Sequence, residues 1–158
     1  MSRAFTLIEL LVVTSIIVLM TIWIFPNYQA GNEELNLQIS ASKLTQNLRK
    51  AQEMAVSAKE FQGEVPGGGY GIYFDISDPA RYVLFADKDA GNDYDGLSED
   101  VEIFELEKNT KIESLSPSGP LTVIFSPPDP IIYFSPDAAT VSITLELKNQ
   151  KTVRVNKA

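Results

Sequence analysis

The sequence predicts an α+β protein in which one long N-terminal helix packs on an antiparallel β-rich globular domain. Three observations support this fold class. An apolar run of membrane length occupies residues 5–25, a helical period continues in more polar sequence over residues 26–60, and short runs of β-forming residues fill residues 61–158. At 158 residues the chain has room for one such helix and one domain of ordinary size.

The apolar run contains a single charged side chain. It reads FTLIELLVVTSIIVLMTIWIF, in which Glu9 is the only acid, and no charged residue follows until Glu33. A helix of about twenty apolar residues is long enough to cross a bilayer core. A carboxylate within such a helix costs roughly 2.5 to 3.5 kcal/mol on insertion scales. We therefore expect residues 5–25 to span a membrane and Glu9 to have a functional partner.

Two simpler explanations remain open. Arg3 and the apolar run also fit a secretory signal peptide with a cleavage site near Ala30, which would leave an ordinary membrane-anchored or secreted β domain. Glu9 is also close enough to the N-terminus for its carboxylate to reach the lipid headgroups. Signal-peptide cores are typically shorter, and a carboxylate that only reaches the headgroups has no evident advantage over an apolar side chain. A specialised segment is therefore favoured.

The residues FTLIELLVV at positions 5–13 resemble the processing signature of type IV prepilins and of the pseudopilins of type II secretion. In that family a short basic leader is removed, and the new N-terminal phenylalanine is methylated. The resemblance implies a leader of residues 1–4, cleavage between Ala4 and Phe5, and methylation of Phe5. The family usually has glycine where this chain has Ala4, so we expect cleavage to be slow.

The resemblance also implies a role for Glu9, which would pair with the free amine of a neighbouring subunit, so that its charge is neutralised only in an assembly. The protein would be a single-pass subunit of the inner membrane with its globular domain outside the cytoplasm, and part of a helical filament after assembly. Its partners would be other pilins or pseudopilins, a prepilin peptidase and, indirectly, a platform protein and an assembly ATPase. The β-rich domain is most similar in outline to the H-type pseudopilins and the FimT-like minor pilins.

Composition argues against an enzyme. The chain has no cysteine and no histidine, which removes thiolate chemistry, the commonest general base and the commonest transition-metal ligand. The net charge of −8 makes bulk nucleic-acid binding a poor fit, because phosphate contacts need a basic surface. We expect a structural subunit without a catalytic site or an obligatory cofactor.

Residues 26–60 continue the helical period as an amphipathic segment. Pro26 and Gly31 stand near its start, and they predict either a helix kink at Pro26 or local melting around it. A proline at this place also agrees with the resembled family. Small residues in the second half favour packing on a sheet, with a coiled coil as the alternative. The expected apolar face comprises Leu37, Ala41, Leu44, Leu48, Ala51, Ala55 and Ala58.

Beyond residue 60, runs of β-forming residues alternate with connections rich in Gly, Pro, Asp and Asn, which favours antiparallel hairpins. The glycines at 67–69 follow a helix and enter a strand, so they indicate a chain reversal and not a phosphate loop. The proline-rich residues 127–130 are expected to form a stiff connection. The expected strands cover residues 70–74, 81–86, 101–106, 121–125, 131–134, 141–147 and 152–155.

Four aspartates lie in one turn-rich segment and form a candidate calcium site: Asp87, Asp89, Asp93 and Asp95. Calcium takes six to eight oxygen ligands, which such loops can supply, although the spacing is not that of an EF-hand. The alternative is a solvated loop chosen for its turn-forming residues. Residues 87–113 hold ten acids and three lysines, a local charge of −7 that suits either a basic partner or solvent.

The C-terminus has the opposite charge. Four cations stand beside the single acid Glu146, and the resemblance to FimT-like minor pilins implies a DNA-uptake role for such a basic region. Four cations next to a strongly acidic body are a weak electrostatic footprint for DNA. A DNA-binding minor pilin therefore remains the alternative function, with Lys148, Lys151, Arg154 and Lys157 as its candidate contacts.

Overall fold

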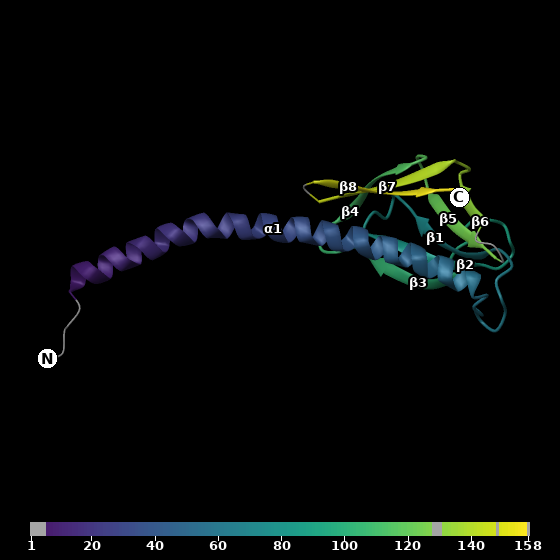
Figure 1. Ribbon diagram of the computed structural model, residues 1–158, viewed down its shortest axis with the longest axis horizontal. Helices are drawn as coiled ribbons and strands as arrows, with labels where there is room; N and C mark the ends of the chain where they lie inside the picture. The colour runs from purple at the N-terminus through teal and green to yellow at the C-terminus, as the bar shows by residue number, and fades with distance from the viewer. Residues whose placement is uncertain (1–5, 128–130, 148, 158) are drawn as a thin grey trace.

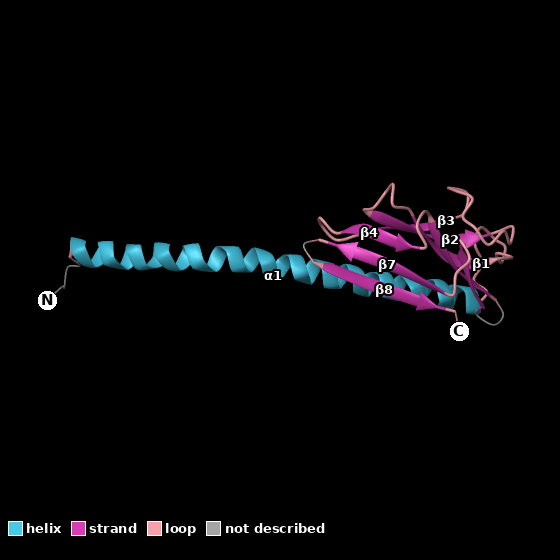
Figure 2. Ribbon diagram, turned by 90° about the horizontal axis from the view of Figure 1, so that it is seen from above, coloured by secondary structure: helices cyan, strands magenta, loops and turns pink. Residues whose placement is uncertain are grey.

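The computed structural model describes residues 6–127, 131–147 and 149–157, and for residues 25–30 it describes the backbone alone. It consists of one helix and two antiparallel sheets, so the predicted α+β class is confirmed. Helix α1 (Leu7–Val56) is 50 residues long. Its N-terminal half projects away from the β domain, and its C-terminal half lies along the sheets (Figures 1 and 2).

The helix is continuous through the segment where melting was predicted. The backbone is helical at Pro26 and at Gly31, and Figure 1 shows α1 as one gently curved helix. Pro26 therefore does not interrupt the helix, so the alternative of local melting is wrong. The helix shows gentle curvature in place of a sharp kink (Figure 1).

The C-terminus of α1 is set by a left-handed residue. Ala58 has φ +46°, and the Lys59 N–H donates to the Met54 carbonyl at 3.1 Å while the Ala58 N–H donates to the Ala55 carbonyl at 3.0 Å. These two bonds form a Schellman motif, which ends the helix after Val56. The sequence prediction that the helix and its apolar face extend to Ala58 is thus wrong, because the chain reverses before that residue and leaves it exposed.

Eight strands form the two sheets. The five-stranded sheet has the order β3-β2-β1-β5-β6 and the three-stranded sheet the order β4-β7-β8, with every neighbouring pair antiparallel. The strands are β1 (Gly69–Phe74), β2 (Arg81–Asp87), β3 (Asp100–Glu105), β4 (Lys111–Ser116), β5 (Leu121–Ser126), β6 (Ile131–Ser135), β7 (Thr140–Glu146) and β8 (Gln150–Asn156).

Seven of these strands match the predicted runs to within two residues at each end, and β4 was missed. Strand β4 buries only Ile112 and Leu115, which are three residues apart, because the pairing with β7 shifts between Ile112 and Ser114. A β-bulge of this kind breaks the alternation on which strand prediction depends. No alternating pattern was therefore available in the sequence.

One hydrophobic core joins the helix to both sheets. The predicted helix face is buried from Leu37 to Ala55, which supports packing on sheets over a coiled coil. Tyr70, Ile72 and Phe74 of β1 face it from the five-stranded sheet, and Val141, Ile143 and Leu145 of β7 belong to the same cluster. The β domain is thus held to the C-terminal half of α1, and the segment Leu7–Ile24 is not buried against any described part of the chain.

Candidate functional site

The N-terminal half of α1 is an exposed apolar rod. The segment Leu7–Ile24 has a mean hydropathy of 2.5, and none of it is buried within the protein. Large apolar side chains cover all its sides, from Leu7 at 82% exposed to Trp23 at 87%. A soluble helix normally buries one apolar stripe, whereas a helix that is apolar all round belongs in a membrane or a larger assembly. In length and composition this helix is able to cross a membrane.

Glu9 takes part in a capping box at the start of this rod. The Glu9 N–H donates to Thr6 Oγ1 at 3.3 Å, and the Thr6 hydroxyl and N–H donate to Glu9 Oε2 at 2.9 and 3.2 Å. Sequence analysis missed this local role, although a threonine followed three residues later by glutamate is its usual signal. The candidate cleavage residues Ala4 and Phe5 lie outside the described residues.

The acidic segment forms the loop between β2 and β3, and two buried carboxylates hold it together. Asp87 ends β2, and its Oδ1 and Oδ2 accept the N–H groups of Gly91 and Asn92 at 3.2 and 2.9 Å. Glu99 immediately precedes β3, and its two oxygens accept the N–H groups of Lys88 and Asp95 at 3.1 and 3.0 Å. Each carboxylate therefore satisfies loop amides that strand pairing leaves free.

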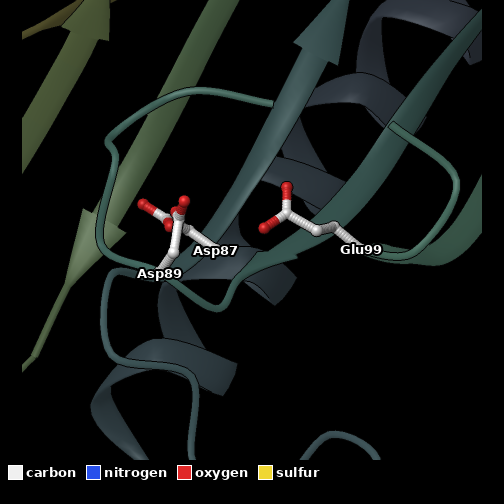
Figure 3. A group of neighbouring side chains, drawn as sticks. All are labelled: Asp87, Asp89 and Glu99. Carbon is white, nitrogen blue, oxygen red and sulfur yellow. The ribbon is translucent and has the colours of Figure 1, made fainter. Parts of the chain in front are cut away.

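Only part of the predicted calcium set comes together. Ligand oxygens of Asp87, Asp89 and Glu99 lie within 4.8 Å of one another (Figure 3), and Asp87 and Glu99 are buried while Asp89 is exposed. Asp93 and Asp95 are exposed and do not join this group; the Asp93 carboxylate instead accepts the neighbouring Tyr94 N–H at 2.9 Å. Three carboxylates could contribute ligands to a hard cation, although calcium prefers six to eight oxygens.

Glu99 was missed because its position depends on strand pairing. The Ala86 N–H donates to the Glu99 carbonyl at 2.9 Å, so the ends of β2 and β3 bring Glu99 beside Asp87 across the loop. The β2–β3 pairing shifts at Leu84 and Phe85, which a simple hairpin register does not anticipate. Burial raises the pKa of Asp87 above its ordinary value, and the hydrogen bond from the Asn92 N–H opposes this shift in part.

The structure separates the candidate DNA contacts. Lys151 shares a face of β8 with Val153, opposite the buried Leu145 and Ile143 of β7, whereas Arg154 pairs with Ser142 on the other face. Lys157 forms an ion pair with Asp137, which lowers the pKa of that carboxyl group. Lys148 lies outside the described residues. The described cations therefore do not form one basic patch, and a continuous phosphate-binding surface is not supported.

Comparison with models of known protein families, with curated proteins and with solved structures finds no match for this chain.

Proposed function

We propose that this protein is a membrane-anchored assembly subunit whose N-terminal helix joins it to other subunits. The observation that supports the proposal is the exposed apolar rod Leu7–Ile24, which belongs to the same continuous helix that packs in the β domain. The rod has no apolar partner within the described part of the chain. A bilayer would cover it in storage, and helices of neighbouring subunits would cover it in an assembly.

Within that class, the protein we propose is a pseudopilin or minor pilin of the type II secretion and type IV pilus superfamily, nearest to the H-type pseudopilins and FimT-like minor pilins. The motif at residues 5–13 supports this assignment, and the arrangement of one long helix against antiparallel sheets is compatible with it. The leader would be removed before Phe5, and the subunit would wait in the inner membrane with its β domain outside the cytoplasm.

Glu9 would act when the subunit leaves the membrane. A carboxylate in a low-dielectric layer is strongly destabilising without a partner, so pairing with the amine of a neighbouring subunit would favour the assembled state. In the full-length chain the same carboxylate caps the helix through Thr6. The charge and the cap are two separable contributions, and an experiment must distinguish them.

Three variants make that distinction in the native host, with the sheared filament fraction and the membrane fraction measured separately. Glu9→Gln keeps a capping acceptor and removes the charge, because glutamine also serves in a capping box. Thr6→Ala removes the cap hydroxyl and keeps the charge. Glu9→Ala removes both functions of Glu9.

If charge pairing drives assembly, all three proteins reach the membrane, Thr6→Ala assembles normally, and both Glu9 variants are depleted from filaments. If Glu9 is only a helix cap, Glu9→Gln assembles normally and Thr6→Ala shares the defect of Glu9→Ala. Normal filament yield in all three variants would contradict the proposal.

The intact mass and the N-terminal sequence of the protein from its native membrane test processing directly. A chain that begins with methylated Phe5 supports the prepilin assignment despite Ala4. An uncut Met1 indicates a permanent anchor, and a start near Gly31 indicates an ordinary secreted domain and removes the filament proposal.

A further inference from the structure

A groove of about 430 Å³ lies between the C-terminal half of α1 and strand β8. The helix lines it with Ser42, Thr45 and Arg49, and the strand lines it with Lys151, Thr152 and Val153. The lining is mixed, because it contains the apolar Ala41 and Val153 as well as the two cations Arg49 and Lys151.

The charge of this groove is opposite to that of the protein. The chain has a net charge of −8, yet the lining contains Arg49 and Lys151 and no acid. Neither cation belongs to an ion pair found among the described residues. By contrast, Lys43 of the same helix forms an ion pair with Glu107, which follows β3. Lys50 forms an ion pair with Glu102 of β3. Helix α1 thus has two paired cations toward β3 and one available cation, Arg49, toward β8.

The strand on the other side of the groove has a free edge. Within the described part of the chain, strand β8 is the edge strand of the three-stranded sheet and pairs only with β7. An edge strand presents unpaired N–H and C=O groups, which an extended segment from another chain can use to extend the sheet. The groove therefore combines a strand edge that can form backbone hydrogen bonds with two cations, Arg49 and Lys151, in its lining.

We propose that this groove binds an extended acidic segment of a partner protein, which adds as a fourth strand beside β8 and places carboxylates near Arg49 and Lys151. The backbone edge supplies pairing that does not depend on sequence, and the two cations select for acidic side chains. DNA fits this site less well, because nucleic-acid binding requires many phosphate contacts and the body around the groove is acidic. The proposal is independent of how the N-terminal helix assembles.

The test uses the full-length chain in a neutral detergent and rhodamine-labelled peptides followed by fluorescence anisotropy. The acidic probe is the peptide TEVEVET, and TQVQVQT is its uncharged counterpart. A third peptide has the acidic sequence with N-methyl groups on every internal backbone nitrogen, so that it keeps its charge and loses the N–H donors for strand pairing on both edges. Binding of the acidic peptide, with at least about fivefold weaker binding of each of the other two, is the expected result.

Variants then locate the site. Arg49→Gln and Lys151→Gln each lose roughly two- to fivefold in affinity, the scale of one exposed ion pair, and the double variant loses about tenfold. Lys108→Gln is the matched control, because it removes one exposed positive charge outside the groove and keeps wild-type affinity. Far-UV circular dichroism of each variant verifies that the domain is folded.

Several results would overturn the proposal. These are failure of the acidic peptide to bind at millimolar concentration, equal binding of all three peptides, and equal losses in the groove variants and the control. Displacement of the peptide by duplex DNA at physiological salt would assign the groove to nucleic acid instead. Unchanged peptide binding together with increased self-association of Lys151→Gln would show that this lysine only protects the strand edge.

Discussion

Gly68 lies against the carboxylate of Asp87 so closely that a Cβ atom on Gly68 would be 2.0 Å from Oδ2 and 2.2 Å from Cγ of Asp87. The Gly68 N–H donates to the Asp87 carbonyl at 2.9 Å, and both residues are buried. Gly68 therefore does more than reverse the chain, because it makes room for a buried acid that organises the β2–β3 loop.

The first prediction concerns this contact. Gly68→Ala should lower the free energy of unfolding by about 1 to 3 kcal/mol, the usual range for overpacking a filled interior. Gly67→Ala is the matched control, since its nearest contact would be an ordinary 3.5 Å to the Lys88 carbonyl oxygen. Urea unfolding of the full-length chain in detergent measures both, followed by near-UV circular dichroism because the single tryptophan, Trp23, lies outside the β domain. Equal stability of the two variants would contradict the prediction.

The second prediction is a pH dependence that arises from Asp87. Burial raises the pKa of this carboxyl group in the folded domain above the ordinary 3.8. Between the two values the folded state binds more protons than the unfolded state, so the free energy of unfolding from this group falls as pH rises, by at most about 1.4 kcal/mol per pH unit. The contribution is fully present below pH 3.8 and is lost as pH passes the folded pKa.

Asp87→Asn isolates this effect. The amide loses one acceptor for a loop N–H, which lowers stability at every pH, but it does not titrate. The decrease in unfolding free energy from pH 4 upward should therefore be shallower in the variant than in the wild type. Parallel curves would assign the pH dependence to other groups.

The third prediction concerns calcium. The buried carboxylates of Asp87 and Glu99 already accept four loop N–H groups, so the loop is held without a metal ion. We expect millimolar calcium or EDTA to change the melting temperature by less than about 1 °C, well below the shift of a ligand that binds only the folded state. A calcium-dependent increase of several degrees that disappears in Asp89→Asn would instead establish a metal site.

The fourth prediction tests the docking of the β domain on the helix. Leu44 is completely buried in the core that the helix shares with the sheets, whereas Leu35 on the same helix is 53% exposed. Leu44→Ala should lower the free energy of unfolding by about 2 to 5 kcal/mol, and Leu35→Ala should change it by less than about 0.5 kcal/mol. The two substitutions remove the same atoms from one helix, so similar losses would mean that the helix face is assigned incorrectly.

Local patterns in the sequence were sufficient to predict the helix and most of the strands. The apolar run of residues 5–25, the three-and-four spacing from Leu37 to Ala55 and the alternation of Val141, Ile143 and Leu145 each indicate a single helix or strand. Each pattern involves residues that are close in the sequence, because burial of one face of a helix or strand places apolar residues at a regular spacing. They were weakest where local structure departs from regularity, at the bulged strand β4 and at the left-handed Ala58.

Tertiary structure decided which residues meet. The sequence by itself determined a membrane-length helix, an amphipathic continuation and most strands, but it did not divide the strands between two sheets. Tertiary pairing brings Glu99 beside Asp87 and Lys151 beside Arg49. Each of these relationships depends on pairing between strands, or between a strand and the helix, across long stretches of sequence. Strand register, bulges and burial of one shared core determine such pairings, and no short segment contains that information.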